Sequence, residues 1–226
     1  MLDSITKKHL HPHVIAISII ILTTIIFFWP LLIGGDWHIP YEGGDLESFI
    51  WPSYRFAAGR LHTDTIPLWN PYLHSGSPYA ADNQSGLFYP PNLILAISPD
   101  ISYRTMEWLV FIHVFIAGSG MYFAASHHYK AKDIRPPLVA ALAFQFSSVF
   151  VTHIGNLNII ASASYLPWIW LCTLRLRDTQ TLTAASFLVI PLSLSIFSGH
   201  AQMSLIVCIP IFIYAIWQLK IKETRL

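Results

Sequence analysis

Seven of the 12 carboxylates in this chain lie between residues 34 and 105, in a stretch that separates two apolar segments. They are Asp36, Glu42, Asp45, Glu47, Asp64, Asp82 and Asp100. A positioned carboxylate can take a proton from a hydroxyl group, and such a general base contributes about 10²–10⁴-fold to a rate. The sequence shows no nucleophile triad, glycine-rich phosphate loop or zinc-ligand spacing. These carboxylates and the polar residues near them are therefore what the chain offers for chemistry.

Asp45 is the first residue of DLESFIWPSYRFAAGR at 45–60, a segment with an apolar stripe that predicts a helix. Two roles fit Asp45. It can act as a general base, or its side chain can cap the helix, which is worth about 1 kcal/mol. Asp36 and Glu47 are the alternative bases. Pro52 is expected to break or kink the helix.

The segment ADNQSG at 81–86 offers a second polar cluster. Asp82, Asn83 and Gln84 can bind hydroxyl groups of a ligand or a cation, or they can form an Asx-type turn in a proline-rich loop. Three cations lie between residues 34 and 105 and can hold a phosphate or extend to lipid headgroups. They are Arg55, Arg60 and Arg104. His153 and His200 stand in two short polar connections, HIGNLN and SGHAQ, where a functional and a structural role are both open.

The rest of the chain is apolar enough to predict an integral membrane protein. Apolar residues make up 54% and charged residues 11%, against about 25% charged residues in a soluble domain. A membrane-spanning helix needs roughly 20 apolar residues. We expect spans at about 14–33, 106–125, 138–154, 159–176, 182–197 and 201–219, with an outside loop at 34–105.

Basic residues predict the orientation of these spans, because cytoplasmic loops carry an excess of Lys and Arg. With the N-terminus inside, ten of the 13 basic residues fall on the inside and three on the outside. Those on the inside are Lys7, Lys8, Lys130, Lys132, Arg135, Arg175, Arg177, Lys220, Lys222 and Arg225. Glu107 and His113 fall within the second span. Glu107 lies near the outer interface, where we expect it to be solvated. His113 lies deeper, where we expect it to form a hydrogen bond within the bundle.

The outside loop is rich in aromatic residues, prolines and glycines, whereas disordered segments contain few aromatics. Trp and Tyr favour the membrane–water interface. We therefore expect an ordered loop on the outer leaflet, with short interfacial helices at 45–60 and within 87–98. The two cysteines, Cys172 and Cys208, fall in apolar stretches and are expected to be buried and unpaired.

The order of these segments resembles a known family. One apolar segment, then GGDLESFIWP, then PLWNPYLHSGSPYAADNQSGLFYPP, then closely spaced apolar segments is similar to the YfhO-like bacterial membrane proteins. The resemblance covers about residues 14–218, and SGHAQ is similar to a GHPQ-like element, with Ala201 where proline is common. That family looks like the GT-C glycosyltransferases, which transfer a sugar from polyprenyl phosphate on the outer face of the membrane.

The resemblance implies an all-α polytopic membrane protein, a GT-C-like helical bundle whose long first outside loop bears short interfacial helices. It favours Asp45 as the catalytic base. It also implies substrate-binding roles for four residues that match family positions, Asp82, Gln84, His200 and Gln202. With Arg55, Arg60 and His153 from the considerations above, these form the predicted substrate-binding set. Because the family's members are much longer, residues 1–226 are expected to form a single membrane domain at the N-terminal part of a longer protein.

These observations together predict a membrane glycosyltransferase that moves a sugar from a polyprenyl-phosphate donor to a cell-envelope acceptor. The alternatives are a transporter or flippase of a lipid-linked substrate and a non-catalytic membrane scaffold. The expected partners are the lipid bilayer, the lipid-linked sugar and a polymer, lipid or protein acceptor, with no nucleic acid. No metal site is expected; a divalent cation stays possible, although no DxD pair is present. The expected location is the bacterial cytoplasmic (inner) membrane, with several passes and a cytoplasmic N-terminus.

Overall fold

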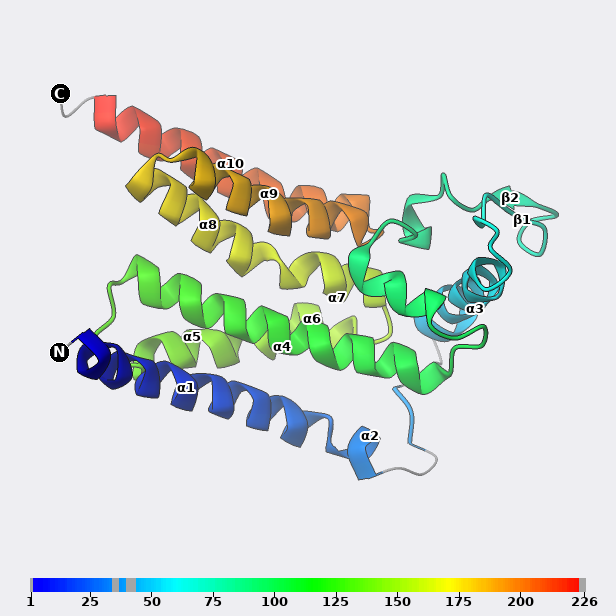
Figure 1. The fold of residues 1–226 in the computed structure, drawn as a ribbon, viewed down its shortest axis with the longest axis horizontal. Helices are drawn as coiled ribbons and strands as arrows, with labels where there is room; N and C mark the ends of the chain where they lie inside the picture. Colours follow the sequence, from blue (N-terminus) through cyan, green and yellow to red (C-terminus); the bar gives the residue numbers. More distant parts are fainter. Residues whose placement is uncertain (1, 34–36, 40–43, 224–226) are drawn as a thin grey trace.

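The computed structural model describes residues 2–33, 37–39 and 44–223, and these residues form an elongated helical bundle with a smaller element at one end (Figure 1). The bundle helices run roughly along the long axis. Their bounds are α1 Leu2–Phe27, α2 Trp29–Ile33, α4 Tyr103–His128, α5 Arg135–Gln145, α6 Ser148–Thr152, α7 Leu157–Ser164, α8 Leu166–Thr179, α9 Leu182–Phe197 and α10 Ala201–Glu223. The expectation of a mostly helical chain is therefore confirmed.

Helix α4 lies at the centre of the bundle. It packs against α1 and α5 on one side and against α7 and α8 on the other, and α9 and α10 pack outside α7 and α8. Its N-terminus is capped by Ser102, whose side chain accepts a hydrogen bond from the Thr105 amide at 3.2 Å. Such a cap satisfies one of the amides that have no partner within a helix.

Among the residues that the structure describes, two helices are long and apolar enough to cross a membrane: α4, and the nearly continuous α7–α8 over 157–179. Shorter apolar helices cover 12–27, 182–197 and 201–217. The segment 138–154 is not one helix, because α5 ends at Gln145 and α6 begins at Ser148. Pro167 falls at the second position of α8, where it costs no helical hydrogen bond.

Residues 44–102, which we call the cap, form the element at the end of the bundle (Figure 1). The cap contains η1 Leu46–Ile50, α3 Trp51–Leu61, β1 Trp69–Asn70, β2 Ser77–Pro78, η2 Asn83–Ser85 and η3 Pro90–Ala96, with β1 and β2 pairing antiparallel. Both expected short helices are therefore present. Pro52 does not break the first one; the helix changes there from a wide π-turn to an α-helix, because proline has no amide to donate.

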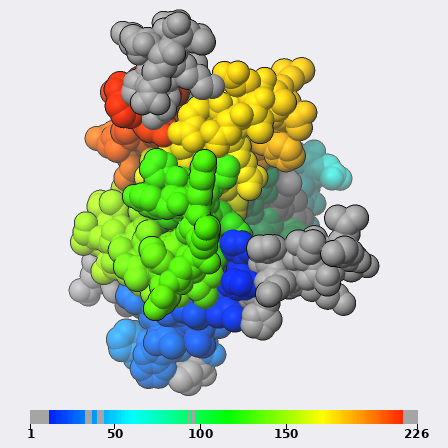
Figure 2. Space-filling view, turned by 90° about the vertical axis from the view of Figure 1, so that its left-hand side faces the viewer, coloured from blue at the N-terminus to red at the C-terminus, as the bar shows by residue number. Residues whose placement is uncertain are grey.

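The start of α1 and the end of α10 lie at the end of the bundle opposite the cap (Figure 1). Figure 2 looks at that opposite end, with the α4–α5 connection (green) between α1 (blue) and the α8–α9 turn (yellow). The connections α6–α7 and α9–α10 lie at the capped end. The fold thus gathers the predicted site residues of the cap and of these two turns at one end of the molecule.

Candidate active site at the capped end of the bundle

The start of the cap is fastened to the α6–α7 turn. The Oδ2 atom of Asp45 accepts a hydrogen bond from Asn156 Nδ2 at 2.8 Å, and the Leu46 amide donates to the Gly155 carbonyl at 2.9 Å. Gly44 makes this approach possible, since a Cβ atom there would lie 3.1 Å from both the Cα and the O atom of Gly155. The turn therefore fixes the position of the Asp45 carboxylate.

The alternative role of Asp45 as a helix cap is not what the structure shows. Asp45 itself has helical backbone angles, and its side chain makes no capping hydrogen bond. The carboxylate is exposed. Within the described part of the chain, Oδ1 has no hydrogen-bond partner. One oxygen is thus held in place while the other stays open to a hydroxyl group.

The two alternative bases are less well placed. Glu47 is half-buried on η1, and Asp36 lies outside the described residues. Glu107 corrects a prediction, because it is fully buried rather than solvated at the interface. Its Oε1 accepts from the Ile39 amide at 2.7 Å, and its Oε2 lies 3.0 Å from the Arg104 guanidinium. Glu107 therefore holds the chain ahead of the cap against α4.

Asp82 and Gln84 occupy a tight turn. Asp82 Oδ1 accepts from the Gln84 amide at 2.9 Å and caps η2, so the Asx-turn alternative describes its side chain. Both side chains are exposed. The Gln84 carbonyl accepts from Asn158 Nδ2 at 2.9 Å, which places this turn directly against the first turn of α7.

A third turn, between α9 and α10, joins this contact. A Cβ atom on Gly199 would lie 2.9 Å from the Asn83 carbonyl and 3.0 Å from Asn158 Nδ2, and Gly199 has a φ of +96°. Only glycine adopts that conformation without strain. Asn158 therefore lies where the cap, the start of α7 and the turn before α10 meet. Asn156 and Asn158 were not among the predicted site residues; their one signal in the sequence is the pair of asparagines in HIGNLN, just before an apolar helix.

The two histidines present different hydrogen-bonding groups. His200 Nδ1 accepts from the Met203 amide at 3.0 Å, so neutral His200 carries its proton on Nε2 and presents a donor there. His153 Nδ1 lies 3.1 Å from the Val149 carbonyl, to which it must donate, so neutral His153 presents an acceptor at Nε2. Both side chains are half-buried, and Gln202 is exposed on the first turn of α10.

The arginines of the cap differ in their freedom. Arg55 donates from Nε to Asp100 Oδ1 at 2.7 Å, and its guanidinium lies 5.2 Å from the centre of the Trp51 ring. Arg60 is exposed near the end of α3. Arg60 is thus the freer of the two, because a phosphate would have to displace Asp100 from Arg55. The structure does not bring Arg60 together with Asp45, however, since the two lie at opposite ends of the η1–α3 segment, about 20 Å apart.

A buried hydrogen-bond chain fastens the other end of the cap to the bundle. Tyr89, in the FYPP sequence, reaches His113 Nε2 and the Tyr165 hydroxyl, each at 2.5 Å. His113 Nδ1 lies 2.6 Å from the Leu109 carbonyl and must donate to it, so Nε2 accepts from Tyr89, which in turn accepts from Tyr165. Burial and the neighbouring Tyr165 hydroxyl raise the pKa of Tyr89 far above its ordinary value, so its hydroxyl keeps its proton.

The described residues contain no group of three or more His, Cys, Asp or Glu side chains that could hold a metal ion. Comparison of the chain with protein-family models, with curated proteins and with solved structures finds no match. What the capped end can do is therefore inferred from its own residues, which are an exposed carboxylate bonded to Asn156, a donor at His200 and an acceptor at His153.

Proposed function

We propose that this chain is a multi-pass protein of the bacterial cytoplasmic membrane, with a GT-C-like bundle and the cap on the outer face. The helices that cover the expected spans run between the same two ends of the bundle. Of the ten basic residues assigned to the inside, the nine that the structure describes fall in segments at the end opposite the cap. Large apolar side chains are exposed along α9 and α10, as lipid contact requires; among them are Phe187, Ile190, Leu205, Phe212 and Ile213.

Within this setting, the proposed activity is transfer of a sugar from polyprenyl phosphate to a hydroxyl of a cell-envelope acceptor. A single observation carries it: Asp45 is an exposed carboxylate that Asn156 positions and that the helix does not use as a cap. The similarity of the GGDLESFIWP and FYPP strings to YfhO-like proteins supports the same activity.

The chemistry follows from the hydrogen-bonding groups. Asp45 Oδ1 takes the proton of the acceptor hydroxyl as its oxygen attacks the anomeric carbon, and the bond from that carbon to the phosphate oxygen breaks. Such a base contributes about 10²–10⁴-fold. The Nε2 donor of His200 can stabilise the negative charge on the departing phosphate. Arg60 lies at the other end of the η1–α3 helical segment, about 20 Å from Asp45, so we give it no role in this step. His153 Nε2 and the exposed side chains of Gln84 and Gln202 are available to sugar hydroxyls.

A transporter or flippase is the alternative with an observation in its favour, since His113 and Gln145 are polar groups buried deep in the bundle. Transporters place substrate groups near the membrane midplane. However, both ring nitrogens of His113 are already bonded, to Tyr89 and to the Leu109 carbonyl. Gln145 Oε1 has no hydrogen-bond partner among the described residues, but Gln145 is fully buried. The exposed open groups lie at the capped end, which favours chemistry there.

The experiment compares Asp45→Asn with the unsubstituted chain in membranes supplied with a panel of radiolabelled polyprenyl-phosphate sugars. We expect label transfer to fall by about 10²-fold or more, with unchanged amounts of protein in the membrane. Asp64→Asn is the matched control, because Asp64 is also an exposed carboxylate of the cap and its backbone conformation suits Asn. Retained transfer in Asp45→Asn would remove Asp45 as the base, and loss confined to Glu47→Gln would assign the role to Glu47.

A further inference from the structure

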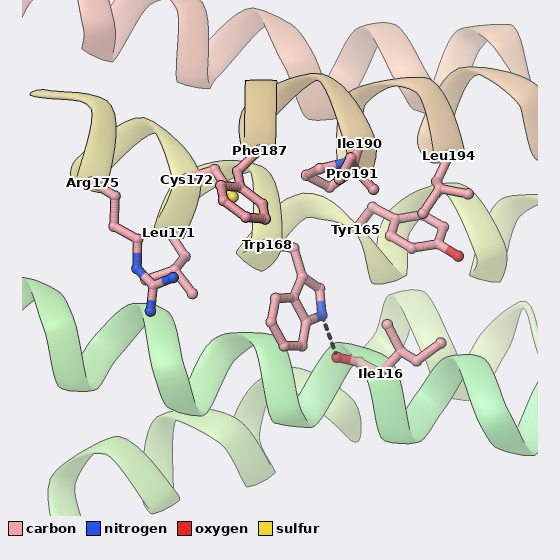
Figure 3. A pocket seen from close by; sticks show the side chains of 10 residues that line it. All are labelled: Ile116, Tyr165, Trp168, Leu171, Cys172, Arg175, Phe187, Ile190, Pro191 and Leu194. Atoms are coloured by element: carbon pink, nitrogen blue, oxygen red, sulfur yellow. Dashed lines mark hydrogen bonds between the residues drawn. The ribbon is translucent and has the colours of Figure 1, made fainter. Parts of the chain in front are cut away.

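A groove lies between α8 and α9 and runs from Tyr165 toward Arg175, away from the cap (Figure 3). The cavity in this groove has a volume of about 270 Å³, and most of the side chains that line it are apolar and come from α4, α8 and α9. Trp168 forms the floor, where its Nε1 donates to the Ile116 carbonyl at 2.9 Å. Phe187 and Ile190 lie across from it on α9.

A second cavity of about 340 Å³ continues the groove toward the α8–α9 turn. The two cavities adjoin, because Cys172, Arg175 and Phe187 line both. The lining changes along the way from apolar to polar, since the second cavity is bordered by the threonines of the turn, Thr179, Thr181 and Thr183. The groove is therefore amphiphilic, with its polar mouth at the end where the predicted cytoplasmic loops lie.

The charge at the mouth is unbalanced. Arg175 is exposed beside the groove and, within the described part of the chain, has no carboxylate partner, whereas the neighbouring Arg177 pairs with Asp178 at 2.8 Å. In Figure 3 the guanidinium of Arg175 extends from α8 toward α4 at one end of the groove. A guanidinium matches the geometry of a phosphate group. The Thr179 hydroxyl already donates to the Arg175 carbonyl at 2.9 Å, whereas the Thr183 hydroxyl can donate to the same phosphate as Arg175.

We infer that this groove binds an anionic phospholipid of the inner leaflet, with one acyl chain between α8 and α9 and its phosphate at Arg175. The inference rests on the proposed membrane setting and is independent of sugar transfer. Apolar contact alone would not select a lipid, because lipid tails are as apolar as the walls of the groove. The selectivity for an anionic headgroup comes from Arg175.

The test measures how fast a thiol on the wall of the groove reacts. The full chain carries Cys208→Ala, which leaves Cys172 as its one thiol. It is placed in nanodiscs of phosphatidylcholine, with or without phosphatidylglycerol of the same acyl chains, and treated with N-ethylmaleimide, a neutral reagent. We expect phosphatidylglycerol to slow alkylation about fivefold, which is the preference that one basic residue near an anionic lipid surface gives.

Two variants separate the site from the general effect of a charged surface. Arg175→Gln should abolish the difference between the two lipids, and Lys132→Gln, an exposed cation at the same end of the bundle, should leave it intact. Equal rates in both lipids, or the same slowing in Arg175→Gln, would overturn the inference. So would equal protection by inorganic phosphate, which needs no groove, or slow alkylation in detergent without lipid, which would point to a second copy of the chain as the cover. A chain that does not enter the nanodiscs would instead refute the membrane setting itself.

Discussion

Replacing Tyr89 by Phe tests whether the cap is pinned to the bundle by the buried hydrogen-bond chain. The substitution keeps the ring but removes the hydroxyl that donates to His113 Nε2 and accepts from Tyr165. His113 is 1% exposed and Tyr165 is 5% exposed, so water cannot easily replace the lost partner. Leaving a buried polar group without a partner costs about 1–3 kcal/mol. We expect Tyr89→Phe to lower the free energy of unfolding by about that amount.

Tyr89 is the middle member of the buried hydrogen-bond chain, so its replacement should cost more than that of Tyr165 at the end. Tyr165→Phe removes a donor at the end and leaves the Tyr89–His113 bond intact, so its cost should be nearer the net value of one hydrogen bond, about 0.5–1.5 kcal/mol. Tyr72→Phe, at a ring that is 83% exposed, should cost nothing measurable. Each kcal/mol lowers Tm by roughly 2–4 °C in a chain of this size. Thermal unfolding in detergent, followed by tryptophan fluorescence, gives the order of the three variants. Equal effects of Tyr89→Phe and Tyr165→Phe would refute the assigned donors and acceptors of these hydrogen bonds.

Three further substitutions test contacts around the site. Gly199→Ala should destabilise the protein by about 1–3 kcal/mol, because φ is +96° and the new Cβ would meet the Asn83 carbonyl; an unchanged Tm would contradict that contact. Glu107→Gln removes the charge that faces Arg104 and should lower the free energy of unfolding by about 1–3 kcal/mol. It should also make residues 37–39 easier to cleave by protease, because Glu107 accepts from the Ile39 amide. Protection equal to that of the parent would show that Glu107 does not hold this segment. Arg55→Gln should change the free energy of unfolding by less than about 1 kcal/mol, because the side chains of the Arg55–Asp100 pair are 47% and 71% exposed, and a larger loss would mean that the pair organises the cap.

The helices were predictable from the sequence because apolar runs and capping residues are local signals. The segment 182–197 coincides with α9. The segment 45–60 matches η1 and α3 to within one residue, and 87–98 contains η3, whereas η2 was not predicted. The interruption of 138–154 was not predicted, since a continuous apolar run does not show where α5 ends and α6 begins. The lengths and order of the helices thus follow from the sequence more closely than their breaks.

The partners of the site residues were not predictable, because they come from distant parts of the chain. Asp45 and Asn156 are 111 residues apart, and Tyr89 and Tyr165 are 76 apart. No spacing rule brings such pairs together. Glu107 was misjudged for the same reason: its burial depends on residues 38–39 folding back onto α4. By contrast, the Asx-type turn at Asp82 is a contact between neighbours, and the sequence did suggest it.

The most direct measurement is sugar transfer by the purified chain in proteoliposomes, with the cap facing the medium and a radiolabelled polyprenyl-phosphate sugar in the bilayer. If Asp45 is the base, labelled product accumulates with the parent chain and with Asp64→Asn, and it falls by about 10²-fold or more with Asp45→Asn. Product that forms equally well with Asp45→Asn, or no product with the parent chain from any lipid-linked sugar tested, would contradict the assignment of the capped end as a glycosyl-transfer site.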